Sequence, residues 1–329
     1  MLRMPPFELL QPNDLDEAIA LLCLHKGQAR ILAGGTDLLP ALKYGKDAAE
    51  VVIALGRIDA LRGVSHSDAG LRIGALTTLD DVGADPDINT LAPAVAAAAI
   101  SAASPPIRRR ATLGGNLLLD VRCRYVDQSA LFRTALGGCL KSHGAECHVV
   151  PGGRTCVAAL CADTVAPMVA HGATIEIAGE QGRRTLPLAD LYDADGCTPA
   201  RIGASEILCA VTLPTLAPNT VVASRRWALR KAIDFPLISV AARVERNDDG
   251  EVRGGAVVVT ALGPQPRITA LDAYVGHRLD DETRAAIVAH VLRRSRTLPN
   301  LPFDAEYRHE RLGVELARLL RGMAVMASD

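Results

Sequence analysis

The chain has 329 residues, of which 49% are hydrophobic and 3% aromatic, and its formal net charge is −1. This length allows two or three domains with hydrophobic cores, and the composition excludes a disordered chain. The near-zero charge and the scarcity of aromatic residues argue against a nucleic-acid-binding surface. The N-terminus lacks the pattern of a signal peptide, and no stretch has the ~20 apolar residues of a membrane span. We therefore expect a cytoplasmic protein that binds no nucleic acid.

The first part of the chain predicts a small α/β unit. Asn13 or Asp14 can cap an amphipathic helix, which is followed by a short apolar strand. The strand ends at Gly34-Gly35, a turn that can leave backbone N–H groups free to hold a phosphate. Asp37 would repel a phosphate if it pointed at one. We therefore expect Asp37 to cap backbone amides or to reach a sugar hydroxyl.

A second glycine pair lies further along the chain. Strands over 49–55 and 70–78, then a buried, alanine-rich helix over 91–103, lead to Gly114-Gly115. The two pairs together suggest a clamp that holds the two phosphates of one dinucleotide from opposite sides. A lone glycine pair is more often only a tight turn, and neither pair is part of a GxGxxG motif. The sequence therefore does not predict an ordinary nucleotide-binding α/β fold.

Half of the cysteines are concentrated in one stretch. They lie in glycine-rich loops that also carry arginines and a lysine, and positive charge favours thiolates. The intervals C-x15-C-x7-C-x8-C lack the C-x2-C pairs of most structural zinc sites, so the spacing alone does not name a metal. In a reducing compartment, eight cysteines indicate metal binding or chemistry rather than disulfides. The candidate ligands are Cys123, Cys139, Cys147 and Cys156.

Two alternatives to this metal site stay open. Free cysteines are often small buried hydrophobic residues, and Cys161 in the apolar run VAALCAD fits that role best. A structural zinc site on a docking protein is the other alternative for the four clustered cysteines. Beyond them, the pattern predicts a helix and strands of the same unit, two strand-rich stretches, and charged helices over 281–295 and 305–324 whose arginines face solvent.

Several segments resemble one known family. The chain is similar to the FAD-carrying medium subunits of the xanthine dehydrogenase family of molybdenum hydroxylases in ILAGGTDLLP, RATLGGNLL, ADTVAPMVAHGA, SEILCAVTLP, RKAIDFPLISVAA and EYRHERLGVELARLL. The resemblance covers essentially the whole chain and implies an α+β fold. It divides the chain into an FAD-binding domain made of a small α/β unit and a larger α+β unit, a cysteine-rich insertion loop in the latter, and a C-terminal α+β domain. The expected ranges are 1–57, 58–220, about 117–161 for the insertion, and 221–329.

The insertion is similar to that of the 4-hydroxybenzoyl-CoA reductase branch of the family, where it carries a [4Fe–4S] cluster. This resemblance implies an electron-transfer subunit with FAD and [4Fe–4S], which does not catalyse the substrate step on its own. The implied partners are a large molybdopterin subunit and a small subunit with two [2Fe–2S] clusters, in a dimer of heterotrimers, with ferredoxin as the electron donor. A carbon monoxide, xanthine or aldehyde-type dehydrogenase subunit that passes electrons to NAD or a quinone is the alternative.

The resemblance also implies cofactor contacts. The residues expected on the FAD pyrophosphate and ribityl chain are Arg30, Ile31, Leu32, Ala33, Gly34, Gly35, Thr36, Asp37 and Leu38. Those expected on the other side of the cofactor are Thr112, Gly114, Gly115 and Asn116, with Asp163 on a cofactor hydroxyl and Arg230 and Lys231 near the flavin. Two positions depart from the family pattern: Arg109 often corresponds to Asn, and Arg226 to a lysine.

Overall fold

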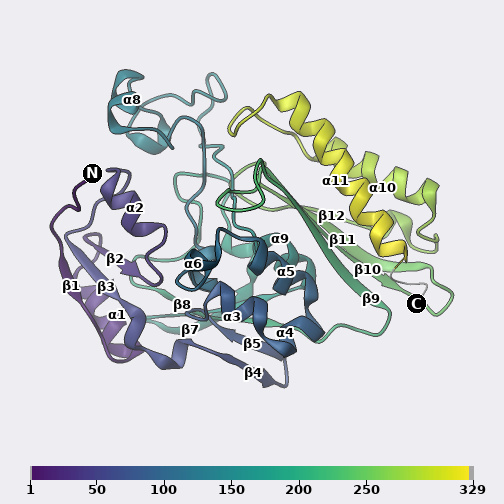
Figure 1. Cartoon of the computed structure of the whole chain (residues 1–329), viewed down its shortest axis with the longest axis horizontal. Helices are drawn as coiled ribbons and strands as arrows, with labels where there is room; N and C mark the ends of the chain where they lie inside the picture. The colour runs from purple at the N-terminus through teal and green to yellow at the C-terminus, as the bar shows by residue number, and fades with distance from the viewer. Residues whose placement is uncertain (1, 326–329) are drawn as a thin grey trace.

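The computed structural model describes residues 2–325, whose three sheets follow one another along the longest axis of the molecule (Figure 1). The mixture of sheets and helices confirms the predicted α+β class. Within residues 2–325, no helix is long and apolar enough to cross a membrane.

The first sheet is parallel and has three strands in the order β1-β3-β2. Its elements are β1 (Glu8–Leu10), α1 (Leu15–Leu24), β2 (Ala29–Leu32), α2 (Leu38–Lys43) and β3 (Val51–Ala54). Asp14 caps α1, because its carboxylate accepts the N–H of Glu17 at 2.8 Å while the Glu17 carboxylate accepts the N–H of Asn13 at 2.7 Å. This reciprocal pair confirms the predicted start of the helix. Strand β2 then leads the chain directly into Gly34-Gly35.

The second sheet has five antiparallel strands in the order β4-β5-β8-β6-β7. Its strands are β4 (Val64–Ser67), β5 (Gly70–Gly74), β6 (Thr174–Gly179), β7 (Gly182–Pro187) and β8 (Ile207–Leu213). The helices of this part are α3 (Leu79–Ala84), α4 (Pro86–Leu91), α5 (Pro93–Ser101), α6 (Pro105–Arg108), α7 (Leu113–Leu117) and α9 (Val165–His171). Its 3-10 helices are η1 (Leu55–Arg57), η2 (Asp59–Leu61) and η4 (Leu188–Leu191).

The alanine-rich stretch forms the predicted buried helix with slightly shorter bounds. Within 91–103 the helix is α5, which begins at Pro93 and ends at Ser101, and the separate helix α4 ends just before it at Leu91. Between them, Ala92 has φ −142° and ψ 55°. A proline disfavours helical backbone in the residue before it, which explains the break.

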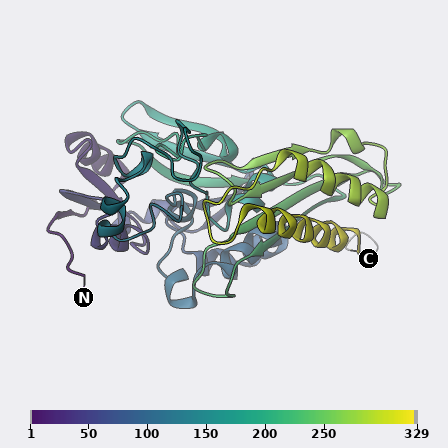
Figure 2. The ribbon, with the colours of Figure 1, turned by 90° about the horizontal axis from the view of Figure 1, so that it is seen from above.

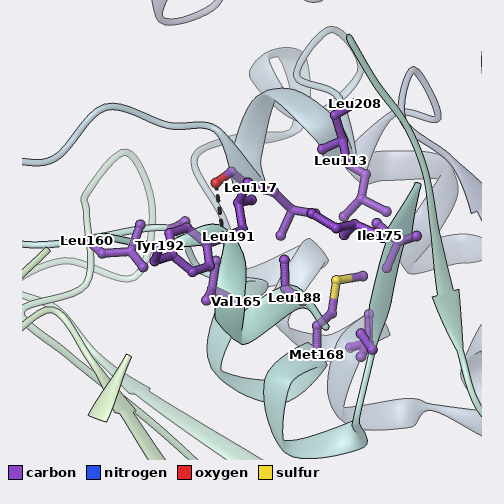
Figure 3. Packing of buried hydrophobic residues seen from close by; sticks show 14 of the residues in the cluster. Leu113, Leu117, Leu160, Val165, Met168, Ile175, Leu188, Leu191, Tyr192 and Leu208 are labelled. Atoms are coloured by element: carbon purple, nitrogen blue, oxygen red, sulfur yellow. Dashed lines mark hydrogen bonds between the residues drawn. The ribbon is translucent and has the colours of Figure 1, made fainter. Parts of the chain in front are cut away.

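The largest hydrophobic core lies in this second part. Leu113 and Leu117 of α7 belong to one buried cluster with Met168 of α9 and Ile175 of β6 (Figure 3). The buried hydroxyl of Tyr192 donates to the carbonyl oxygen of Leu117 at 3.1 Å, the dashed line in Figure 3. Since α7 carries the second glycine pair, this packing fixes that pair against the core.

The third sheet has four antiparallel strands in the order β12-β11-β10-β9. Its elements are β9 (Thr220–Trp227), β10 (Ile238–Arg246), β11 (Val252–Thr260), β12 (Arg267–Ala270), η5 (Asp272–Tyr274), α10 (Asp281–Arg294) and α11 (Ala305–Val325). Val240 and Ala242 of β10 pack in one cluster with residues of α10 and α11, whereas Ala241 packs with α9. The sheet is therefore covered on both faces, with α10 and α11 side by side on one of them (Figures 1 and 2).

One arginine of α11 is buried, although the helical pattern predicted solvated arginines. Arg308 is fully buried and donates hydrogen bonds to the carbonyl oxygens of Leu298, Leu237 and Ala261 and to Oδ1 of Asn300. Burial lowers the pKa of its guanidinium to about 10. The side chain thus joins α11 to three loops by neutral acceptors.

The cysteine-rich insertion begins and ends at two paired residues of the second part. Arg122 and Ala159 form an antiparallel bridge, with hydrogen bonds of 2.8 and 2.7 Å between their backbones. The loop between them contains α8 (Ala130–Ala135) and η3 (Leu140–Ser142) and extends above the rest of the chain in Figure 1. Arg133 of α8 donates to the carbonyl oxygen of Gly45 at 2.8 Å, so the loop also contacts the first part of the chain.

Candidate functional site

The turn after β2 presents unused backbone donors. Within residues 2–325, none of the N–H groups of residues 34–37 donates a hydrogen bond. Gly35 has φ +76°, a left-handed conformation that glycine adopts without strain. A Cβ on Gly34 would overlap the carbonyl oxygen of Arg110, so this turn lies directly against the segment that leads to the second glycine pair. Consecutive free N–H groups at a turn can hold an anion, which makes this turn the candidate phosphate site.

The second glycine pair has no free donors. The N–H groups of Leu113 and Gly114 donate to the carbonyl oxygens of Thr77 and Ala75 at 2.9 and 2.8 Å. The N–H of Gly115 donates to Oγ1 of Thr112, which caps α7, at 3.1 Å. The expectation that both pairs offer amides to one cofactor is therefore wrong for this pair, because the core and the helix cap already use them.

A cavity of about 200 Å³ lies between the two turns. The segments that line it include Ala33-Gly34 on one side and Arg109, Arg110 and Thr112 on the other. With Arg62, three arginines thus line the cavity together with Gly34 of the free turn. Arg109, which departs from the family pattern, is 74% exposed and only loosely paired with Asp80 at 3.5 Å, so its side chain is available to a ligand.

Several side chains of the first expected segment are already engaged. Arg30 forms an ion pair with Asp47 at 2.9 Å, so it does not point to the turn. Ile31 and Leu32 complete β2, while Thr36 is exposed.

Asp37 does not cap α2, so the first of its two expected roles is wrong, while contact with a sugar hydroxyl stays a prediction. It pairs with Arg122 at 2.5 Å instead. Leu38 is the first residue of α2. The backbone of this segment and the exposed hydroxyl of Thr36 are therefore free to hold an anion.

Asn116 and Asp163 bond to protein groups. Oδ1 of Asn116 accepts the hydroxyl of Thr164 at 2.7 Å and its N–H at 3.2 Å. Asp163 is 6% exposed and accepts Nε of Arg226 at 2.5 Å. Burial raises the pKa of Asp163 to about 6, although the charge of Arg226 opposes this. Arg226, the second departure from the family pattern, is thus the partner of Asp163.

The basic pair Arg230 and Lys231 lies in an exposed loop after β9. Arg230 donates to the carbonyl oxygen of Ile233 at 2.7 Å, and its backbone N–H donates to Asp234 at 3.1 Å. Ile233 has φ +55°, a strained value for a β-branched residue. The loop therefore keeps a defined shape, while both basic side chains reach solvent.

The four clustered cysteines line one small cavity. It has a volume of about 20 Å³ and is bordered by Cys123, Cys139, Cys147 and Cys156. Burial raises the pKa of the Cys123 and Cys156 thiols to about 11. By contrast, Cys161 is packed in a separate cluster with Ala159 and Leu237, as expected of a structural residue.

The cysteine cavity has no metal-binding arrangement of side chains. Within residues 2–325, no three histidine, cysteine or carboxylate side chains come together as they would around a metal ion. The four cysteines share the lining of one cavity, and their role as cluster ligands stays a prediction.

Several residues that support the cavity were not predicted. Asp195 accepts the N–H groups of Cys156 and Cys197 at 2.9 and 3.0 Å. Lys141 borders the cavity and donates to the carbonyl oxygen of Gly196 at 2.7 Å, and the hydroxyl of Ser142 donates to the sulfur of Cys139 at 3.3 Å. The basic character of the loop hinted at Lys141, but no local pattern marked Asp195.

Comparisons with known proteins identify the family. Residues 5–216 match the FAD binding domain in molybdopterin dehydrogenase. The aldehyde oxidoreductase FAD-binding subunit PaoB of Escherichia coli (strain K12) is 32% identical over 257 residues, which cover 75% of this chain and 79% of that protein. The carbon monoxide dehydrogenase medium chain of Hydrogenophaga pseudoflava is 37% identical over 113 residues, 34% of this chain and 39% of that protein. This chain therefore belongs to the family of FAD-binding subunits of molybdenum-containing dehydrogenases.

Solved structures share the whole fold. Carbon monoxide dehydrogenase from Hydrogenophaga pseudoflava aligns with a TM-score of 0.78 at 23% identity and covers 99% of both chains. Quinoline 2-oxidoreductase from Pseudomonas putida 86 aligns with a TM-score of 0.80 at 22% identity, over 99% of this chain and 100% of that one. The family resemblance expected from the sequence is thus confirmed, and the chain is an FAD-binding oxidoreductase subunit.

Proposed function

We propose that this chain is the electron-transfer subunit, with FAD and one [4Fe–4S] cluster, of a molybdenum-containing enzyme of the 4-hydroxybenzoyl-CoA reductase type. In such an enzyme, ferredoxin donates electrons, and partner subunits with [2Fe–2S] clusters and molybdenum reduce the substrate. The observation that carries the proposal is the shared cavity of Cys123, Cys139, Cys147 and Cys156. The rest of the chain supplies the flavin framework of the family.

The turn over 34–37 fits the pyrophosphate of FAD. Its four free N–H groups are donors for an anion, and Arg109 and Arg110 add positive charge across the cavity. The second glycine pair contributes differently: Gly115 is exposed, and only Oγ1 of Thr112 lies near the position of a Cβ. It therefore leaves room for the cofactor. When bound, FAD supplies the exchange between one-electron and two-electron transfer.

We propose a cluster rather than one ion at the four cysteines. In a [4Fe–4S] cluster each thiolate binds a different iron atom, so the four sulfur atoms stand farther apart than the ligands of one zinc ion. Burial raises the pKa of the Cys123 and Cys156 thiols to about 11, so these thiols would lose their protons only when the metal binds. Lys141 and the hydroxyl of Ser142 then stabilise the thiolates.

A second candidate function is the subunit of a carbon monoxide, xanthine or aldehyde-type dehydrogenase that passes electrons to NAD or a quinone. The names of the relatives favour it, since PaoB is an aldehyde oxidoreductase subunit and the Hydrogenophaga protein a carbon monoxide dehydrogenase chain. This candidate assigns no role to the four grouped cysteines.

Iron analysis tests the proposal. The full-length chain, purified without oxygen, should contain about four irons and no zinc, and it should lose visible absorbance on reduction. Cys139→Ser should lose iron, whereas the control variants Cys161→Ser and Cys23→Ser should keep it. A wild-type chain that contains FAD but no iron would support the second candidate function. One zinc ion per chain would support a structural zinc site.

A further inference from the structure

Arg122 meets all three parts of the chain at one point. Its Nη2 lies 2.5 Å from Oδ1 of Asp37, beside the free turn of the first part. Its Nη1 lies 3.4 Å from Oδ1 of Asp127 in the cysteine insertion, and its guanidinium lies 4.0 Å from the ring centre of Phe235 in the third part. The side chain is only 16% exposed, so these contacts are held in a defined geometry.

The ion pair determines what Asp37 does to the turn. Asp37 directly precedes α2, where a carboxylate ordinarily accepts the first free N–H groups of a helix, yet it makes no such bond. Released from Arg122, its carboxylate would stand beside the turn without a cation, since Pro40 has no N–H and the N–H of Leu39 already donates to the carbonyl oxygen of Gly35. Its negative charge would also repel a phosphate beside it.

We infer that Arg122 is a positioning residue that holds and neutralises Asp37, and so keeps the N–H groups of residues 34–37 open for a phosphate-bearing ligand. This inference rests on the proposed placement of the FAD pyrophosphate at that turn. Arg122 itself does not touch the cofactor in this arrangement. It acts through Asp37.

The same arginine connects the turn to the cysteine insertion. Arg122 immediately precedes Cys123, whose N–H donates to Oδ2 of Asp127 at 3.1 Å. Asp127 also forms an ion pair with Lys46 of the first part. The carboxylates of Asp37 and Asp127 therefore hold the guanidinium of Arg122 between the turn over 34–37 and Cys123, the first candidate cysteine ligand.

Flavin titration of the full-length chain tests this role. After removal of FAD, its dissociation constant is measured by flavin fluorescence for wild type, Arg122→Met and the double variant Arg122→Met/Asp37→Asn. Arg122→Met should weaken FAD binding about tenfold, which corresponds to one lost charge interaction. The double variant should regain most of the affinity, because an amide at position 37 carries no charge to repel the phosphates. Arg124→Met is the matched control, since the exposed Arg124 side chain forms no hydrogen bond or ion pair in the described chain.

The outcomes separate the inference from the proposed function. The positioning role is supported if Arg122→Met binds FAD more weakly than wild type, if added salt partly restores its affinity, and if Asp37→Asn rescues it. FAD binding by Arg122→Met within about twofold of wild type would overturn it, and so would a loss that Asp37→Asn does not rescue, since that indicates general damage. If Gly34→Ala and Gly115→Val both bind FAD as wild type does, the proposed placement of the cofactor is wrong, whatever Arg122→Met does.

Discussion

The two glycine pairs have the same dipeptide and opposite uses. Around Gly34-Gly35 the N–H groups are free, whereas around Gly114-Gly115 every N–H group from Leu113 to Asn116 already has an acceptor. The difference comes from the neighbours. The hydroxyl of Thr112 accepts the N–H of Gly115, and the carbonyl oxygens of Ala75 and Thr77 accept the two N–H groups before it. No such acceptors lie at the turn after β2 in the described chain. A glycine pair therefore indicates close backbone approach, and the surrounding acceptors decide whether it can also bind an anion.

The largest effect should come from Gly34→Ala. Its Cβ would overlap the carbonyl oxygen of Arg110, and backbone cannot move aside as a flexible side chain can. We expect a loss of about 3 kcal/mol or more in the free energy of unfolding, measured by urea denaturation, together with low FAD content. Gly322→Ala in α11 is the control, because nothing lies within 4 Å of its Cβ. Equal stability of the two variants would contradict the close packing of the first turn.

The second pair adjoins a buried carboxylate whose titration can be tested. Burial raises the pKa of Asp163 from 3.8 to about 6, so the folded state binds its proton more tightly than the unfolded chain does. Between about pH 4 and pH 6 the stability should therefore fall as the pH rises. Relative to Asp163→Asn, wild type should lose about 3 kcal/mol over this range, since one pKa unit corresponds to about 1.4 kcal/mol.

Urea unfolding of both proteins at each pH checks this expectation. A stability difference that does not change between pH 4 and pH 7 would show that Asp163 is open to solvent, or that Arg226 fully compensates its burial. In the first case Asp163 would be less buried than the structure indicates, and in the second its ion pair with Arg226 would be stronger.

The smallest effect on stability should come from Gly115→Val. Gly115 is exposed and has only Oγ1 of Thr112 near a Cβ, at 3.0 Å, so the free energy of unfolding should change by less than about 1 kcal/mol. FAD content should nevertheless drop sharply, because in the proposed placement the cofactor passes close to Gly115 and the new side chain would block it. Gly322→Val, at an open glycine of α11, is the matched control. Full FAD occupancy in Gly115→Val would remove the second pair from the flavin site.

The sequence predicted those features that depend on local pattern. The capped helix α1, the loop-rich insertion and the grouping of four cysteines follow from spacing and composition. The position of Cys161 in a separate core also followed from its apolar neighbours.

The missed features depend on partners far away in the chain. Asp37 pairs with Arg122, which is 85 residues later, and the N–H of Cys156 bonds to Asp195, which is 39 residues later. Arg308 looked solvated because its neighbours on α11 are charged, yet its acceptors are carbonyl oxygens of other loops. Local periodicity holds no information on such acceptors.

The bridge between Arg122 and Ala159 has a consequence for how such a chain can change. Paired residues in an antiparallel bridge stand only ~5 Å apart, so the 36 residues between them, 123–158, begin and end at almost the same place. A tight turn could close the same gap, and the chain entropy of a loop grows only slowly with its length. The ends of the cysteine-bearing segment therefore allow a shorter or longer loop at this point, whereas its packed residues Cys123, Cys147 and Cys156 are part of the core that also holds β5, α7 and α9.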